Sequence, residues 1–168
     1  MVEIPQLDTN YILDRNEKES SRLTGQYELF KAASGREAAV PSDINLQNAT
    51  RILDIAAGNL VWTLDVAAHA DIKSRLSPDN ASRVELYACD VSSKQFPPQS
   101  VLDSLGVKTF EHDVTVPFPS EYNDFFDLIH MSMLVAALSE TGWQKALENV
   151  RRILSLSHYC TKSFSELS

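Results

Sequence analysis

The stretch from residue 51 to residue 67 constrains the fold more than any other part of the chain. Arg51–Ile55 is a short, mostly apolar run of the kind that forms a buried strand. Four small or turn-forming residues follow it, and Leu60, Leu64 and Ala67 then recur at helical spacing. A strand that passes through a tight turn into a helix is the first part of a unit that builds parallel sheets.

The rest of the sequence continues this alternation of strands and helices. Leu23, Tyr27 and Phe30 indicate a helix that begins at Ser20 or Ser21 and ends at Gly35. Further strands are expected at 84–89, 107–111 and 127–130, a short helix at 100–105, and a last helix along the stripe Trp143, Leu147, Val150 and Leu154. The 168 residues therefore predict one α/β domain with a Rossmann-like parallel sheet and helices on both faces.

Acidic residues follow two of the expected strands. Asp90 comes directly after the second strand, and Asp113 comes shortly after the third. The carboxyl ends of parallel strands share one edge of a sheet, where ligands bind. At this edge a turn of small residues allows close approach of a ligand, Asp90 could accept both hydroxyls of a ribose, and Asp113 could contact an adenine amino group. This combination predicts a site for a cofactor that carries adenosine.

Other sites and partners lack sequence support. The dinucleotide pattern GxGxxG and the P-loop pattern are absent. A net charge of −8 disfavours binding to nucleic acid and to membrane surfaces. Cys89 and Cys160 have no metal-ligand spacing, so no metal site is expected. The charged first 20 residues do not resemble a secretory signal, which predicts a protein of the cytoplasm, with the nucleus as the second compartment.

Several segments together resemble one enzyme family. Residues 51–67 read RILDIAAGNLVWTLDVA, and LYACDVSS, QFPP, HDVTVPFP and FDLIH follow at 86–93, 95–98, 112–119 and 126–130. With YILDRN at 11–16 and Trp143, this order resembles the class I S-adenosylmethionine-dependent methyltransferases. The similarity is greatest to the fungal small-molecule methyltransferases of secondary metabolism, and it covers roughly residues 10–154.

The resemblance implies a cofactor and a set of contacts for it. S-adenosyl-L-methionine would lie with its amino-acid part along Ala56, Ala57 and Gly58, and with its ribose on Asp90. The adenine would contact Val91 on one side, and Asp113 and Val114 along its edge.

The resemblance also implies a catalytic candidate and three segments. His130 and Met131 would face the methyl-transfer region, so His130 is the candidate catalytic residue, with His112 as the second histidine that could remove a proton. Residues 1–50 would form an N-terminal helical lid that includes Tyr11 and Gln26. Residues 51–154 would form a partial cofactor domain, and 155–168 an irregular tail.

The sequence departs from the family pattern at two places. The family turn reads Asp-x-Gly-x-Gly-x-Gly, whereas this chain has Ala56 and Leu60 at the first and third glycine positions. If Leu60 has a left-handed conformation, it costs about 1–2 kcal/mol, and its side chain would crowd the methionine part of the cofactor. After Leu154 the chain lacks the family's turn into a fifth strand, so only the first four of seven strands are expected, as in a C-terminally truncated member.

Two functional interpretations follow from these departures. The first is an enzyme that transfers a methyl group to an oxygen, nitrogen or carbon atom of a small molecule. The second is a catalytically inactive, truncated methyltransferase-like subunit that acts through a partner chain or serves a non-methylating reaction. Without a fifth strand, 126–130 would be an open sheet edge, which predicts a homodimer or hetero-complex unless the tail covers it.

Overall fold

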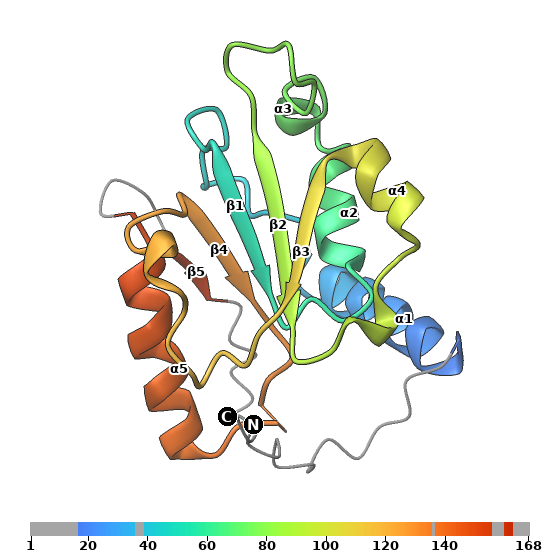
Figure 1. Ribbon diagram of the computed structural model, residues 1–168. Helices are drawn as coiled ribbons and strands as arrows, with labels where there is room; N and C mark the ends of the chain where they lie inside the picture. The colour runs from blue at the N-terminus through green and yellow to red at the C-terminus, as the bar shows by residue number, and fades with distance from the viewer. Residues whose placement is uncertain (1–16, 36–38, 136, 156–159, 163–168) are drawn as a thin grey trace, which may run out of the picture.

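A computed structural model describes residues 17–35, 39–135, 137–155 and 160–162. Its core is a sheet of five parallel strands in the order β3-β2-β1-β4-β5 (Figure 1). The strands are β1 (Arg51–Ile55), β2 (Glu85–Asp90), β3 (Val107–Glu111), β4 (Leu128–Met131) and β5 (Cys160–Lys162). The four strands that the sequence predicts are thus confirmed, with boundaries that differ by at most one residue.

Helices cover both faces of the sheet, which confirms the predicted Rossmann-like α/β class (Figure 1). One face carries α1, α2, α3 and α4, and the other carries α5. Their bounds are α1 (Glu17–Ala33), α2 (Val61–Ala68), α3 (Ala70–Lys73), α4 (Gln99–Leu105) and α5 (Glu140–Ile153), with short 3₁₀ turns at Ser93–Gln95 and Ser120–Tyr122.

Alternation along the strands divides the core into two apolar layers. Ile52, Leu86 and Leu128 are aligned across β1, β2 and β4 and pack in the layer under α2, α3 and α4. Their neighbours Leu53, Tyr87 and Ile129 point to the opposite layer, under α5. Because side chains alternate between faces, the register of the parallel strands decides which residues meet at the end of the sheet.

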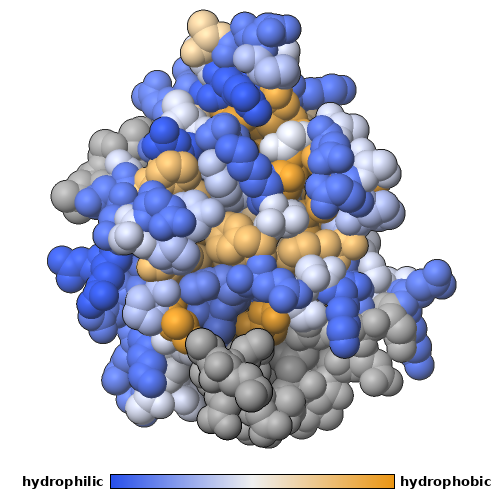
Figure 2. Space-filling view, in the orientation of Figure 1, coloured by the Kyte–Doolittle hydropathy of each residue, from blue (hydrophilic) through white to orange (hydrophobic). Residues whose placement is uncertain are grey.

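The layer under α5 is rich in aromatic rings. Phe126 is fully buried and packs edge-on against Tyr87 at 5.2 Å and against Phe125 at 5.0 Å between ring centroids. Tyr122 stacks on Phe126 and on Phe110 at 5.5 and 5.4 Å. On this side of the molecule, apolar side chains gather in a central band between α5 and α4 (Figure 2). The segment between β3 and β4 therefore completes the core that α5 covers.

The outer edge of β4 corrects one expectation and meets the condition attached to another. Ile129, His130 and Met131 pair in parallel with Cys160–Lys162, so the tail 155–168 is not irregular throughout. Nearer the start of β4, Ser155 N–H donates to Phe126 O at 2.8 Å. The open edge that motivated the prediction of a dimer or hetero-complex is therefore occupied by the chain itself. The sequence shows no strand pattern there because three residues that pair through backbone groups need no alternating apolar pattern.

Two further observations concern the expected N-terminal lid and membrane-spanning helices. Tyr11, which was expected in the lid, lies outside the described residues, whereas Gln26 lies on α1 and accepts a hydrogen bond from Arg22. Among the helices that the structure describes, none has the length and apolar character needed to cross a bilayer.

Candidate functional site at the carboxyl ends of the strands

The turn between β1 and α2 has three left-handed residues at alternate positions. Ala56, Gly58 and Leu60 have φ values of 57°, 53° and 62°. These are the three positions at which the resembling family has glycine, so the backbone keeps the shape although two of the three glycines are replaced. Each non-glycine residue in this conformation costs roughly 1–2 kcal/mol. The turn is therefore a strained element that its surroundings hold in place.

Leu60 contradicts the expectation that its side chain would crowd a cofactor. The left-handed conformation is present, but the side chain is fully buried in the apolar layer under α2. It also lies directly before α2, at the N-cap position. Because the side chain packs inward, Leu60 offsets its backbone strain with core packing.

Asp90 joins the end of β2 to this turn. Its Oδ2 accepts a hydrogen bond from the Gly58 N–H at 3.0 Å, and its Oδ1 accepts one from the Ser92 N–H at 3.2 Å. The neighbouring Ala57 N–H donates to Cys89 O at 3.0 Å. The structure therefore brings together the sequence-predicted group of Ala56, Ala57, Gly58 and Asp90 at one point of the sheet.

The predicted adenine contacts lie along the same edge. Val91, next to Asp90, is 38% exposed. Asp113 Oδ1 accepts hydrogen bonds from the N–H and hydroxyl of Thr115, and its Oδ2 has no partner among the described residues. Val114 is buried, and its carbonyl accepts a bond from Asn149 Nδ2 of α5 at 2.9 Å. An exposed apolar side chain and an available carboxylate oxygen suit a purine ring with an exocyclic amine.

A cluster of buried side chains around Asp54 lies beside the β1–α2 turn. Asp54, 2% exposed, accepts the Thr63 hydroxyl at 2.7 Å on Oδ2 and lies 2.8 Å from His130 Nδ1 through Oδ1. The His130 ring stacks on Trp62 with centroids 4.1 Å apart and planes 6° from parallel. The indole is fixed in turn, because its Nε1–H donates to Ala39 O at 3.1 Å. His130 is therefore held at two points, by a carboxylate and by an aromatic face.

Sequence reasoning identified His130 but missed Asp54, Thr63 and Trp62. A usable signal was present, since Asp54 interrupts an apolar strand and a buried carboxylate requires a partner. The partner follows from register, because Asp54 and His130 are paired positions of adjacent parallel strands. Knowledge that β1 and β4 are neighbours in the sheet would therefore have been enough to pair Asp54 with His130.

Helix α1 lies against the outer side of the turn. Asn59 Nδ2 donates to Ser20 O at 2.9 Å and to Thr24 Oγ1 at 2.8 Å. A Cβ atom on Gly58 would lie 3.0 Å from Leu23 Cδ1, so a larger residue there would have to displace the Leu23 side chain and adopt a strained φ. The helix, the turn and Asp90 therefore form one connected unit.

A second contact joins α1 to α2. Asp65 Oδ2 accepts hydrogen bonds from Tyr27 Oη and Lys31 Nζ, each at 2.6 Å. Burial, together with the bond to Asp65, raises the pKa of Tyr27, so the phenol stays protonated and donates at neutral pH. These bonds place α1, which belongs to the segment 1–50 that was predicted to form a lid, along α2.

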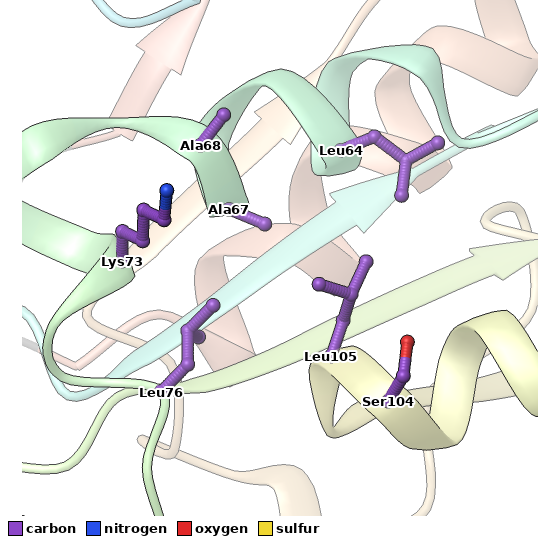
Figure 3. Close-up of a pocket in the computed structure, with 7 residues that line it drawn as sticks. All are labelled: Leu64, Ala67, Ala68, Lys73, Leu76, Ser104 and Leu105. Atoms are coloured by element: carbon purple, nitrogen blue, oxygen red, sulfur yellow. The ribbon is translucent and has the colours of Figure 1, made fainter.

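A pocket of about 320 Å³ lies elsewhere, between α2, α3 and α4 (Figure 3). Leu64, Ala67, Leu76 and Leu105 point toward one another in it, and Lys73, Ala68 and Ser104 complete the lining. Since α2 starts at the carboxyl ends of the strands and α4 ends where β3 begins, their C-terminal turns lie toward the opposite end of the sheet. This pocket is therefore separate from the turn and Asp90. In the described part of the chain, no cluster of three or more His, Cys, Asp or Glu side chains could hold a metal ion.

The chain is similar in sequence to fungal methyltransferases. It is 28% identical over 144 residues to the N-methyltransferase sirN of Leptosphaeria maculans, covering 85% of this chain and 45% of that protein. It is 25% identical over 147 residues to the N-methyltransferase gliN of Aspergillus fumigatus, covering 88% and 47%. The chain thus spans about half the length of the curated relatives that it matches. No family model matches it.

Solved structures agree on the fold. The PH0226 protein of Pyrococcus horikoshii superposes with a TM-score of 0.53 at 14% identity, over 86% of this chain and 57% of that one. The CMeT domain of the citrinin polyketide synthase gives 0.52 at 16% identity, over 87% and 34%. The chain therefore resembles fungal small-molecule methyltransferases in sequence and has the Rossmann-like fold expected of the class I, S-adenosylmethionine-dependent methyltransferases.

Proposed function

We propose that the chain binds S-adenosylmethionine at the β1–α2 turn and supports methyl transfer to a small molecule. The observation that carries this proposal is the bond between the Asp90 carboxylate and the Gly58 N–H. It joins the left-handed turn to the acid at the end of β2, and these are the two parts that the resemblance assigns to the amino-acid and ribose portions of the cofactor.

The residues present suit the cofactor chemically. Asp90 is a carboxylate at the end of β2, and carboxylate oxygens accept hydrogen bonds of the kind that ribose hydroxyls donate. Val91 offers an exposed apolar surface for adenine, and Asp113 Oδ2 offers an acceptor for the adenine amino group. Ala56, Ala57 and Gly58 present the small-residue backbone along which the amino-acid part would lie.

The chemistry that the bound cofactor supplies is an electrophilic methyl group on a positively charged sulfur. The chain's own contribution is to position the two reactants and to restrict water, which is a large part of catalysis in reactions of this kind. The two relatives compared above, sirN and gliN, are named N-methyltransferases, so a nitrogen atom of a small molecule is the first acceptor to test. Helix α1, held on the turn by Asn59, is the proposed lid over this site.

Calorimetric titration of the whole chain with S-adenosylmethionine and S-adenosylhomocysteine tests the proposal. We expect saturable heat with both ligands. Asp90→Ala should weaken binding at least tenfold, because the ribose contact and the support of the turn are lost together. The matched control is Asp103→Ala on the exposed side of α4, which should bind like the unmodified chain. No heat at millimolar ligand, or equal binding by Asp90→Ala, would refute the cofactor site.

A methyl-transfer assay on the samples that bind the cofactor separates the two functional interpretations. Binding together with transfer of a labelled methyl group to a nitrogen-containing small molecule supports the enzyme. Saturable binding with no transfer to any nitrogen, oxygen or carbon acceptor supports the non-catalytic subunit.

A further inference from the structure

The buried dyad of His130 and Asp54 has a defined proton arrangement. An ionised carboxylate accepts hydrogen bonds and donates none, and the Thr63 hydroxyl already donates to Asp54 Oδ2. The contact of 2.8 Å between Asp54 Oδ1 and His130 Nδ1 therefore places the ring proton on Nδ1. The neutral ring then carries its lone pair on Nε2, the atom that faces away from Asp54.

Nothing in the described part of the chain accepts from or donates to Nε2. The contacts recorded for His130 are the Nδ1 bond to Asp54 and the stacking on Trp62, and both leave Nε2 without a bonding partner. The residue is 9% exposed and lies next to the end of β4. The ring is thus fixed in orientation while its basic atom has no structural task among these residues.

The position of the dyad relates it to the proposed cofactor site. His130 pairs in register with Asp54, two residues before the left-handed Ala56 that begins the turn. Asp54, Asp90 and His130 belong to the same face of the sheet, since Asp54 aligns with both Ala88 and His130, and Asp90 lies two residues after Ala88. Asp90, the proposed ribose ligand, and the His130 imidazole therefore lie at the same edge and on the same face of the sheet.

We propose that His130 accepts, through Nε2, the proton that the methyl acceptor releases, and that Asp54 is the residue that positions it. This inference rests on the proposed methyltransferase function. The bond between the acceptor atom and its hydrogen breaks, and the proton moves to Nε2. The electron pair of the broken bond stays on the acceptor atom and forms the new bond to the methyl carbon. The electron pair of the broken sulfur–methyl bond stays on sulfur, and the imidazolium charge is balanced by Asp54. Thr63 and Trp62 hold Asp54 and the ring in place.

The first test is the tautomer of His130 in the full chain labelled with ¹⁵N. Long-range proton–nitrogen spectra of the neutral ring should show the proton on Nδ1 and none on Nε2. The signal is assigned by its loss in His130→Gln, and His69→Gln is the matched control that should leave it unchanged. Asp54→Asn should reduce the Nδ1–H population, whereas Thr63→Val, which keeps the carboxylate, should preserve it. A neutral ring with its proton on Nε2 in the unmodified chain would overturn the proposal without the need for any variant.

The second test asks whether the ring lies at the reacting methyl group. With S-adenosylmethionine labelled with ¹³C in its methyl group, we expect a nuclear Overhauser contact from that methyl to the ring C–H protons of His130 and none to those of His69. A merely structural dyad would show the tautomer but no such contact. Calorimetry on the same sample distinguishes the failures. Saturable heat without the contact overturns the role of His130 alone, and the absence of heat overturns the proposed function as well.

Discussion

The two faces of the sheet bury opposite kinds of side chain at the same edge. Under α5 the last core residues of β1, β2 and β4 are Ile55, Cys89 and Met131, all apolar and buried. Directly beside them in sequence, facing α1 and α2, are Asp54, Asp90 and His130. A shift of one residue in register would exchange the two sets. At this edge the sheet therefore has apolar side chains on one face and polar side chains on the other.

The two faces of the sheet also differ in backbone strain and in the ionisation of their side chains. The left-handed Leu60 is buried in the layer on the α1–α2 face, and the polar groups there are joined by hydrogen bonds from the β1–α2 turn to α1. On the α5 face, burial raises the pKa of the Cys89 thiol, so this group stays neutral and inert. We expect changes on the α5 face to alter stability and changes on the other face to alter ligand binding.

The largest effect should follow from Phe126→Ala. The ring is fully buried among Tyr87, Tyr122 and Phe125, and its removal should lower the free energy of unfolding by about 3–5 kcal/mol. Urea denaturation measures this change, with the exposed Val135→Ala as a control near zero. Binding of S-adenosylhomocysteine by the folded fraction should be unaltered. A loss below about 1 kcal/mol would show that the α5 face is not the stability-determining layer.

Leu60→Gly tests the balance between backbone strain and core packing in the β1–α2 turn. Glycine relieves the left-handed strain of about 1–2 kcal/mol, but it removes a fully buried side chain whose loss costs roughly 2–5 kcal/mol. The variant should therefore be less stable by about 1–3 kcal/mol, although it restores the glycine of the family pattern. Increased stability in urea denaturation would mean that strain, and not packing, dominates at this position.

Ala56→Gly should raise the stability, and by less than Leu60→Gly lowers it. Ala56 is left-handed like Leu60, but its side chain is a single methyl group that is only partly buried. Relief of strain should exceed the entropic cost of glycine, for a net gain of about 0.5 kcal/mol. Thermal unfolding of the pair, Ala56→Gly and Leu60→Gly, checks the two signs together. Equal signs would contradict the different roles assigned to these side chains.

The smallest effect concerns pH and His112. Burial against Phe118 lowers the pKa of His112 from its ordinary value of 6.5, and the bond to Val116 O and the charge of Asp113 only partly oppose this. The folded state therefore binds fewer protons than the unfolded state, and stability is lost as the pH falls from 6.5 through the lowered pKa. His112→Gln should lose less stability than the unmodified chain between pH 7 and pH 5. An unchanged slope in denaturation series would contradict this assignment.

Much of this fold could be predicted because β1 to β4 carry strong local patterns. Ile52, Leu53 and Ile55 indicate a buried strand by themselves, and Asp90 and Asp113 mark the ends of the next two. The glycine that the resembling pattern has in place of Leu60 pointed to a left-handed conformation at that position. These features are local, or nearly local, in sequence.

The features that could not be predicted depend on residues far apart in the chain. The dyad joins Asp54 to His130, and the contact of α1 with the turn joins Ser20 and Thr24 to Asn59. The inward direction of the Leu60 side chain depends on the space under α2, and β5 depends on backbone pairing with β4. None of these contacts has a periodic signature in sequence, so only the assembled sheet reveals them.

A map of backbone amide shifts during titration with S-adenosylhomocysteine tests the central claim most directly. The account predicts large, saturable shifts at 56–58, 90–91 and 113–114, and small ones at 144–152 on α5. Shifts centred on α5, or on the pocket between α2 and α4, or no saturable shifts at all, would contradict the assignment of the cofactor to the β1–α2 turn.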